Sequence, residues 1–483
     1  MKVVLIKPPE KNKLWVGIPR FLNEDIFLFP PLGLMYLKAY AERNTHHKVI
    51  LHDSLVYKTG YAGVAEFVRD VAPRVVGIST FTHSLVDVLE TARAVKAVMP
   101  DVHVSLGGSH TFSFSEESAG LINSGVVDSV MLGDGERSFC ALINAIDLGL
   151  EPRGIEGIVY KSKNGGISGS REVVYENDLD AMPFPYRKEY GYRQYYSPAT
   201  SGKLMTMMIS SRGCPYGCKF CASQKKYRTR SAENIVDEIE WLVKEGFLEV
   251  FFLDETFNTS PERVILVSEE ILRRGIKIIW GFRARCDNVT LEMLRVAKRA
   301  GCAKIHYGVE TGTNEALEAI NKKTTIREIQ ETFWNTKKSG IMTIAYFLLG
   351  CPNEKTGAVI RETVRFSTTL PADYAVFALF SPYPDTPYYK KGVEKGVIDR
   401  RPWDDFMRNP TWDHRIETLW TEHFSKEDLV SSLRGAHRQF YYRPGYVIRT
   451  LFKMRSLREF WRLLAGALSL IKLEIFRKIK GRI

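Results

Sequence analysis

The first 150 residues alternate short apolar runs with longer stretches in which apolar residues recur at helical spacing. The apolar runs cover residues 2–8, 48–54, 74–80, 101–108 and 127–135. They are rich in Val, Ile and Leu, as are parallel strands that are buried on both faces. This alternation predicts an α/β fold that begins with a Rossmann-like, doubly wound domain over residues 1–150.

Small residues stand where these predicted strands end. In a doubly wound sheet, ligands bind beyond the carboxyl ends of the strands. The residues at these ends are Ser79, Thr80, Gly107, Gly108, Gly133 and Gly135, and Glu136 follows the last of them. Adjacent glycines let a backbone approach a bulky ligand closely, but they also make tight turns, and their spacing alone favours neither interpretation.

The alternation resumes after a segment with hairpin and proline signals, which we assign to residues 151–199 as a hairpin and linker. Six further apolar runs are separated by longer helical patterns that end at glycine. These runs cover residues 204–211, 249–255, 277–285, 304–310, 342–350 and 374–382. They predict a partial (β/α)6 barrel of the TIM type over residues 200–400, with its function at the carboxyl ends of the strands.

Length and composition agree with more than one domain. The chain has 483 residues, which exceeds what a single hydrophobic core usually supports. The N-terminus lacks the pattern of a signal peptide, and no apolar run reaches the length of a transmembrane helix. We therefore expect a cytoplasmic protein. Seven cysteines, an odd number with three of them clustered, do not form a disulfide framework.

The net charge of +12 is concentrated near the C-terminus, in a region over residues 401–483 that we predict to be basic and helical. Residues 443–483 contain eleven Lys or Arg and two acids. Apolar and basic residues mix over residues 457–483 as in an interfacial amphipathic helix, and no base-stacking motif indicates nucleic acid. Two interpretations stay open: a solvated helical face that packs on the barrel, or contact with a lipid-like substrate or the cytoplasmic side of a membrane.

The three clustered cysteines, Cys214, Cys218 and Cys221, directly follow the first predicted barrel strand in the segment GCPYGCKFC. Thiolates bind soft metals, chiefly zinc or iron–sulfur clusters. Structural zinc usually takes two pairs of ligands, and no second pair follows here. Three thiolates leave one iron of a four-iron four-sulfur (4Fe-4S) cluster open, so the pattern favours such a cluster with an exchangeable site over structural zinc.

The segment CPYGCKFC in this position resembles the signature of the radical S-adenosylmethionine (radical SAM) superfamily. The resemblance implies that the three cysteines bind the cluster and that S-adenosylmethionine chelates the fourth iron. Its reductive cleavage gives a 5′-deoxyadenosyl radical, which abstracts hydrogen from the substrate. The resemblance further implies contacts to S-adenosylmethionine from Asp254 and Glu255 in FLDETF, from Arg283 or Arg285 in FRARCD, where an arginine could pair with a carboxylate, from Glu310 in YGVETG and from Gly350 in FLLGCPNE.

The N-terminal domain, with PPLGL, VVGIST, LGGSHT and GDGE in this order, resembles the cobalamin-binding class of the same superfamily. The small residues at its strand ends, together with Glu136, are then the implied cobalamin contacts. Many cobalamin domains place Asp-x-His-x-x-Gly after the first strand, whereas KPPEKNK stands there in this chain. We therefore expect cobalamin without a lower axial histidine. FYYRP also resembles the end of the subgroup with anaerobic magnesium-protoporphyrin monomethyl ester cyclase and hopanoid-associated enzymes, whose substrates are large and apolar.

The sequence thus predicts a radical SAM enzyme that functionalises an unactivated carbon of a hydrophobic metabolite and takes electrons from a donor such as flavodoxin or ferredoxin. C-methylation is the leading outcome. Radical cyclisation or ring rearrangement of a tetrapyrrole or lipid type is the alternative. A transfer-RNA methylthiotransferase is disfavoured, since the N-terminal domain has no second cysteine triad. From another class of function, a non-catalytic cluster-bearing binding or regulatory protein stays open.

Overall fold

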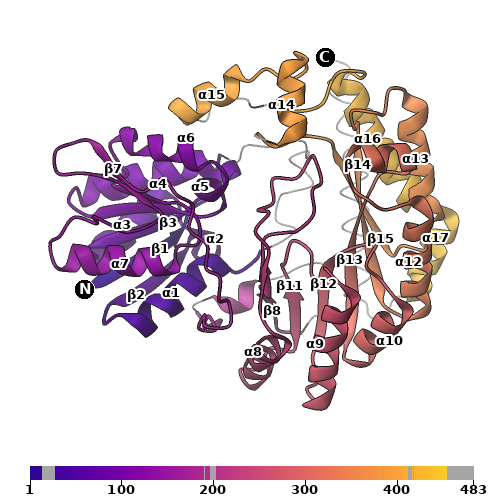
Figure 1. Cartoon of the computed structure of the whole chain (residues 1–483), viewed down its shortest axis with the longest axis horizontal. Coiled ribbons are helices and arrows are strands. Elements are labelled where there is room, and N and C mark those ends of the chain that lie inside the picture. The colour runs from indigo at the N-terminus through magenta and orange to yellow at the C-terminus, as the bar shows by residue number, and fades with distance from the viewer. Residues whose placement is uncertain are drawn as a thin grey trace.

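The computed structural model describes residues 1–12, 28–189, 191–195, 203–384, 386–411, 416 and 418–453. These residues form an α/β protein with two large sheets, which lie side by side in Figure 1. The first sheet contains seven strands and the second six. Among the described residues, no helix combines the length and the apolar character needed to span a bilayer.

The first sheet confirms the five strands that the apolar runs predict. They are β1 (Lys2–Lys7), β2 (Lys48–Asp53), β3 (Val75–Ser79), β4 (His103–Gly107) and β5 (Ser129–Met131). All five run parallel, in the spatial order β2-β1-β3-β4-β5. The helices between them are α1 (Leu32–Asn44), α2 (Ser54–Tyr57), α3 (Tyr61–Val71), α4 (Leu85–Val98), α5 (Ser109–Ser113), α6 (Ser115–Ala119) and α7 (Glu136–Asp147).

Both faces of this sheet are buried, as its apolar strands require. Along β1, Val3 and Leu5 pack into the core that contains residues of α1 and α7, whereas Val4 and Ile6 pack into the core that contains residues of α3 and α4. Successive residues of a strand point to opposite faces, so an uninterrupted apolar run is what a sheet between two helical layers needs.

The hairpin predicted after residue 150 belongs to the first sheet. It consists of β6 (Ile158–Lys161) and β7 (Ile167–Gly169), and β6 pairs antiparallel with β5. The sheet therefore extends beyond the boundary that the sequence predicts, because the hairpin supplies an edge to an otherwise parallel sheet.

The second sheet contains six parallel strands in chain order, which confirms the six predicted repeats. They are β8 (Met205–Met208), β11 (Glu249–Phe252), β12 (Ile279–Arg285), β13 (Cys302–Glu310), β14 (Met342–Leu349) and β15 (Tyr374–Leu379). The crossover helices are α8 (Ala232–Lys244), α9 (Pro261–Arg273), α10 (Leu291–Arg299), α11 (Asn314–Ala319), α12 (Ile326–Lys338) and α13 (Gly357–Thr369).

The sequence sets both ends of these helices. At their start, the side chains of Ser231, Ser260, Thr290, Thr313 and Thr325 each accept a hydrogen bond from a backbone N–H in the first turn. At their end, a glycine with positive φ follows α8, α9, α10 and α12, and turns the chain toward the next strand. The glycines are Gly246, Gly275, Gly301 and Gly340.

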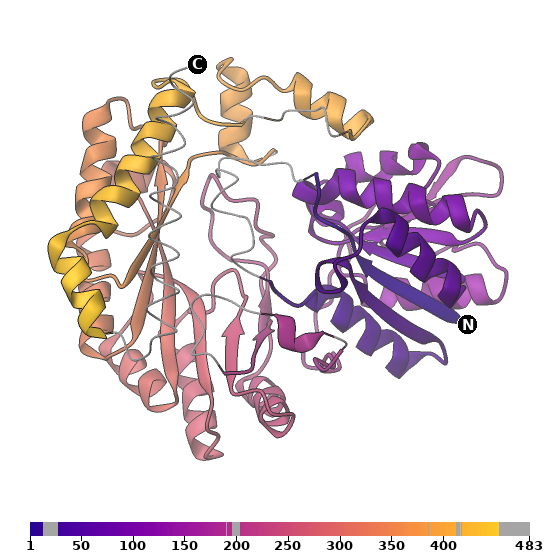
Figure 2. The same cartoon turned by 180° about the vertical axis from the view of Figure 1, so that it is seen from behind.

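The helices cover one face of the second sheet. Phe282, Tyr307 and Phe347 point to that face and belong to the core that contains helix residues such as Leu294 and Phe333. The other face is here called the inner face. In Figures 1 and 2, α9, α10, α12 and α13 lie on the side of the second sheet that is away from the first sheet.

The chain after residue 380 packs against both sheets. It forms α14 (Pro387–Glu394), α15 (Arg401–Arg408), α16 (Lys426–Tyr441) and α17 (Pro444–Lys453). Trp403 and Phe406 of α15 pack into the core of the first sheet, whereas Leu433 and Phe440 of α16 pack into the core of the second. The predicted C-terminal region is thus helical as far as it is described. The amphipathic stretch over residues 457–483 lies entirely outside the described residues.

Candidate functional site

The three cysteines lie in a loop that follows β8 and β9 (Ser211–Arg212), at the carboxyl end of the second sheet. β9 pairs antiparallel with β10 (Arg228–Thr229), and the backbone N–H of Cys214 donates to the carbonyl of Gln224 at 2.8 Å. Gly213 starts the loop with φ of 78°, and a Cβ there would lie 2.4 Å from the carbonyl oxygen of Lys226. Only glycine fits this position, so the loop is closed at its base by backbone contacts.

A polar group lies near each cysteine sulfur. Sγ of Cys214 lies 3.8 Å from the hydroxyl of Thr256, and Sγ of Cys221 lies 3.0 Å from that of Ser223. A guanidinium nitrogen of Arg285 lies 3.6 Å from Sγ of Cys218. These donors suit sulfur atoms that carry negative charge, as metal-bound thiolates do.

The spacing of the sulfurs fits a cluster better than a single ion. Thiolates around one zinc ion lie about 3.8 Å apart, given Zn–S bonds of ~2.3 Å and tetrahedral geometry. In the described part of the chain, the one group of three ligating residues with all ligand atoms within 4.8 Å is His46, His47 and Asp147. The sulfurs of the three cysteines do not all lie within this distance of one another, so they are not gathered around one small ion.

Asp254 and Glu255, which the sequence could not tell apart, have different surroundings. The carboxylate of Asp254 is buried and accepts hydrogen bonds from the backbone N–H of Ser210 at 2.7 Å and the hydroxyl of Ser211 at 2.7 Å. Glu255 is exposed, and a hydrogen bond from Ser223 partly offsets the desolvation that raises the pKa of its carboxyl. Glu255 is thus available to a ligand beside the cysteine loop, whereas Asp254 fixes the backbone beneath it.

Arg283 and Arg285, both on β12, also differ in their surroundings. Arg285 is buried against the cysteine loop. Arg283 is exposed on the inner face, at the position that pairs with His306 of β13. The sequence offered both arginines equally, because two residues apart on a strand they share a face and only the loop above distinguishes them.

Glu310 and Gly350 end the next two strands in unusual conformations. Glu310 has φ of 71° at a register shift between β13 and β14, and its carboxylate accepts a hydrogen bond from Lys322 at 2.7 Å. Gly350 has φ of 81°, and Glu354 accepts from its N–H at 2.6 Å. Glu310 is a left-handed non-glycine residue held by an ion pair, and such strain gathers at functional sites.

A network of ion pairs joins the first sheet to the cysteine loop. Glu136, at the start of α7, accepts from Arg212 at 2.5 and 3.2 Å, and Asp134 lies 2.9 Å from the same guanidinium. Asp134 also pairs with Arg228 of β10. Because Arg212 precedes Cys214 by two residues, the carboxyl end of β5 is fixed beside the root of the loop. Glu136, a predicted cobalamin contact, has its carboxylate in this junction.

Two glycines at the strand ends of the first sheet lie directly against the backbone of neighbouring segments. A Cβ on Gly108 would lie 2.7 Å from the carbonyl oxygen of Thr80, and one on Gly133 would lie 2.1 Å from that of Val174. Their conformations are therefore explained without a ligand. The same edge also carries Ser79, Gly107 and Gly135, and next to them the exposed ring of Phe81.

This edge fits a broad group held by shape and backbone, because its acids are already paired. Among the histidines of this domain, His52 and His110 have buried rings with hydroxyl partners, Thr59 and Thr82. His103 stands at the amino end of β4, whereas the half-buried His83 stacks on Phe81 beside this edge. The residues at this edge thus fit cobalamin held by shape and backbone, and His83 is the histidine whose role a substitution has to test.

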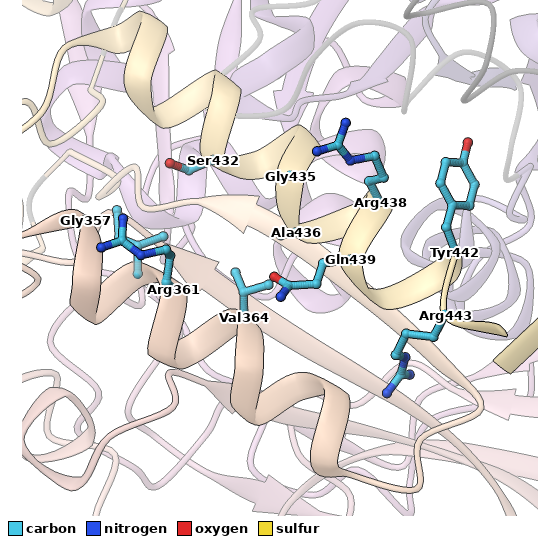
Figure 3. Close-up of a pocket in the computed structure, with 11 residues that line it drawn as sticks. Gly357, Arg361, Val364, Ser432, Gly435, Ala436, Arg438, Gln439, Tyr442 and Arg443 are labelled. Atoms are coloured by element: carbon cyan, nitrogen blue, oxygen red, sulfur yellow. The ribbon is translucent and has the colours of Figure 1, made fainter. Parts of the chain in front are cut away.

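A groove of about 680 Å³ lies elsewhere, between α13 and α16 on the helix-covered side of the second sheet. Figure 3 shows its lining, in which arginines from both helices and from the segment after α16 stand around apolar side chains. The arginines are Arg361, Arg438 and Arg443. None of the lining residues belongs to the cysteine loop or to the strand ends around it, so the groove is separate from the candidate site.

The fold and the site describe a protein with two α/β sheets, in which the cysteine loop lies beside the carboxyl ends of the strands of the first sheet. The sequence profile of the Radical SAM superfamily matches residues 208–364, and that of the B12 binding domain matches residues 26–143. The chain belongs to the cobalamin-binding enzymes of the radical SAM superfamily. The predicted cofactors, a 4Fe-4S cluster, S-adenosylmethionine and cobalamin, are confirmed as those of these two domains.

Relatives match over most of the chain. An uncharacterized methyltransferase of Pyrococcus horikoshii is 29% identical over 458 residues, which cover 94% of this chain and 95% of the relative. The anaerobic magnesium-protoporphyrin IX monomethyl ester cyclase of Rubrivivax gelatinosus is 27% identical over 442 residues, covering 89% and 77%. The solved structure of the cobalamin-dependent S-adenosylmethionine radical enzyme OxsB, with aqua-cobalamin and S-adenosylmethionine bound, has a TM-score of 0.72 and 17% identity, and the match covers 99% of this chain and 75% of OxsB. This last likeness shows the shared fold.

Proposed function

We propose that this enzyme methylates an unactivated carbon of a hydrophobic metabolite. The observation that carries the proposal is the junction in which Asp134 and Glu136, at the edge of the B12-binding domain, hold Arg212 beside the cysteine loop. Methyl transfer to a substrate radical needs the methyl donor and the radical source at one place, and proximity of this kind is a main source of catalytic rate. The junction keeps the two cofactor edges adjacent.

The bound cofactors would supply a 5′-deoxyadenosyl radical and a methyl group, and the chain would hold them. Cys214, Cys218 and Cys221 would bind three irons of the cluster. Glu255 would accept hydrogen bonds from the amino group of S-adenosylmethionine, with Asp254 positioning the backbone beneath it. The remaining proposed contacts are Arg283 to the carboxylate, Glu310 to the ribose or carboxylate, and Gly350 to the adenine, while Ser79, Thr80, Gly107, Gly108, Gly133, Gly135 and Glu136 would surround cobalamin.

The proposed layout is a Rossmann-like domain against a partial (β/α)6 barrel whose inner face receives the substrate. Val376 supports an apolar substrate, since its side chain is 41% exposed although it lies on strand β15. Phe81, 43% exposed at the edge of the first sheet, adds a second apolar contact. The proposed electron donor is flavodoxin or ferredoxin. Contact with a membrane surface through residues 454–483 is proposed from their composition alone.

Radical cyclisation is the second candidate, and the cyclase of Rubrivivax gelatinosus, which aligns over 442 residues, favours it. Both reactions begin with hydrogen abstraction. They differ in what happens to the substrate radical: methylation consumes a methyl group and therefore a second equivalent of S-adenosylmethionine, whereas cyclisation does not.

Anaerobic reconstitution with iron, sulfide and cobalamin tests the proposal. Adding S-adenosylmethionine and dithionite should release 5′-deoxyadenosine in a reductant-dependent way, and S-adenosylhomocysteine should accumulate beside it. 5′-Deoxyadenosine without S-adenosylhomocysteine would favour the cyclase. Neither product from a protein with a complete cluster would overturn the proposal and favour a non-catalytic binding protein.

A further inference from the structure

Cys218 has different surroundings from the other two cluster cysteines. Among the described side chains, Cys214 and Cys221 have hydroxyl neighbours at their sulfurs, whereas Cys218 faces the guanidinium of Arg285 at 3.6 Å. Arg285 is only 4% exposed. A charged donor to sulfur is stronger than a neutral one, and it gains further strength away from water. The three thiolates therefore lie in an asymmetric field.

Arg285 is held in this orientation from several sides. It forms a two-pronged ion pair with Asp287, with N–O distances of 2.9 and 2.6 Å, and donates to the backbone carbonyl of Lys322. Its guanidinium lies over the ring of Tyr216, 4.0 Å from the ring centroid. Below it, the side chain of Asn258 pairs with the backbone of Arg285 in both directions, each bond 2.9 Å long. The guanidinium cannot swing away from Cys218 without breaking these contacts.

A second buried cation stands behind the first. Lys322 is 5% exposed, and its Nζ lies 2.7 Å from the carboxylate of Glu310. Burial, the largest effect, and the charge of Arg285 both lower the pKa of Lys322, but the negative groups beside it, chiefly the carboxylate of Glu310, together outweigh them, so the pKa is raised. The ammonium stays charged at neutral pH and contributes to the positive field at this corner of the loop.

We propose that Arg285, supported by Lys322, is a positioning residue that sets the reduction potential of the cluster through Cys218. Reduction adds a negative charge to the cluster, and hydrogen bonds and positive charge at a ligating sulfur stabilise that state. Asp287 opposes this effect because its carboxylate partly neutralises Arg285. The inference rests on the cluster assigned to the three cysteines and does not depend on methyl transfer, so it can fail while the proposed function holds, and the reverse.

A redox titration of the reconstituted full chain, followed by electron paramagnetic resonance (EPR) of the reduced cluster without S-adenosylmethionine, tests the proposal. In Arg285→Gln, the ratio of reduced to oxidised cluster at a fixed potential should fall about tenfold, a shift of about 59 mV for one electron. In Asp287→Asn the ratio should rise several-fold, because Arg285 loses its counter-charge. Arg285→Lys should retain most of the wild-type ratio. Arg361→Gln, an exposed site on α13, is the matched control and should leave the ratio unchanged.

The opposite signs distinguish an electrostatic role from a merely structural one. A residue that only holds the loop would reduce iron content in both variants without moving the potential in opposite directions. Full clusters with an unchanged ratio in Arg285→Gln, or shifts of the same sign in both variants, would overturn the proposal. If Arg285→Gln assembles no cluster, Asp287→Asn decides: a rise in the ratio supports the proposal, and an unchanged ratio overturns it.

Discussion

The carboxyl ends of the two parallel sheets hold ligands by different means. At the second sheet, thiols and charged side chains converge, among them Cys218, Glu255 and Arg285. At the first sheet, small residues and backbone line the edge, and its acids, Asp134 and Glu136, are turned toward the second domain. We propose that one edge binds by coordination and charge, and the other by shape. On this proposal, similar strand–helix alternation serves two cofactors because the residues after the strands differ.

The largest expected effect comes from removing a proposed cluster ligand at the edge of the second sheet. Replacing Cys218 by Ala should remove the third thiolate, so that iron per reconstituted chain falls at least tenfold and 5′-deoxyadenosine formation is lost. Iron assay and the absorbance of the cluster measure this. The matched control is Cys140→Ala, since Cys140 is a buried cysteine of α7 in the first domain. A wild-type iron content in Cys218→Ala would refute the assignment of the cluster ligands.

The next largest effect comes from breaking the ion pairs that join the edges of the two sheets. Arg212→Gln leaves Glu136 without this partner and Asp134 with Arg228 alone, and removing one member of a buried pair costs about 3 kcal/mol. The free energy of unfolding should fall by that order in denaturant titrations, and S-adenosylhomocysteine formation should fall more than 5′-deoxyadenosine formation. Arg327→Gln is the control, because the side chains of Arg327 and its partner Glu331 are 88% and 58% exposed and such pairs contribute at most about 1 kcal/mol. Equal losses in both variants would contradict the role of the junction.

A smaller effect comes from buried histidines and appears as a dependence of stability on pH. Burial lowers the pKa of His52 to about 4 and that of His110 to about 3, both in the first domain. Below pH ~6.5 the unfolded chain takes up protons that these buried rings do not, so the free energy of unfolding should fall by a few kcal/mol as the pH drops toward 4. Thermal unfolding across this range measures it. The fall should be shallower in His110→Phe and unchanged in His46→Asn, an exposed site; identical slopes in all three proteins would show that the buried ring is not responsible.

The smallest effect concerns the groove between α13 and α16. Arg361→Gln changes the lining of the groove but touches neither cofactor edge. The rate of product formation should therefore match that of wild type, and the free energy of unfolding should stay within about 0.5 kcal/mol of it. A large loss of 5′-deoxyadenosine formation in this variant would extend the active site to the outer face and weaken the contrast between the two edges.

Much of the fold follows from local pattern. The apolar runs predict all six strands of the second sheet, because each is buried on its helix side, each crossover helix is preceded by Ser or Thr, and a glycine follows four of the six helices. The extent of the first sheet was not predicted, since pairing of β6 with β5 is a long-range contact that no local signal records. The division of the C-terminal region between two cores has the same cause: Trp403 and Leu433 are equally apolar in sequence, but they pack on different sheets.

At the site, the spacing of the cysteines was enough to single out three candidate cluster ligands, and this assignment stays a prediction. The sequence was not enough to separate Asp254 from Glu255, because burial of one and exposure of the other depend on Ser210 and Ser211, more than forty residues earlier. Arg285 was weighed only as a partner for a carboxylate, and its contact with Cys218 crosses 67 positions of sequence. The only trace of this contact in the sequence is the second arginine of FRARCD, and its role becomes clear only when the position of the cysteine loop is known.

We propose that the edge of the first sheet holds cobalamin by shape, without an imidazole below the metal. EPR of the protein loaded with cob(II)alamin tests this arrangement, because a nitrogen ligand splits each cobalt line into three. We expect tightly bound cob(II)alamin with unsplit lines, in wild type and in His83→Ala alike. A threefold splitting that disappears in His83→Ala, or a protein that retains no cobalamin after desalting, would contradict it.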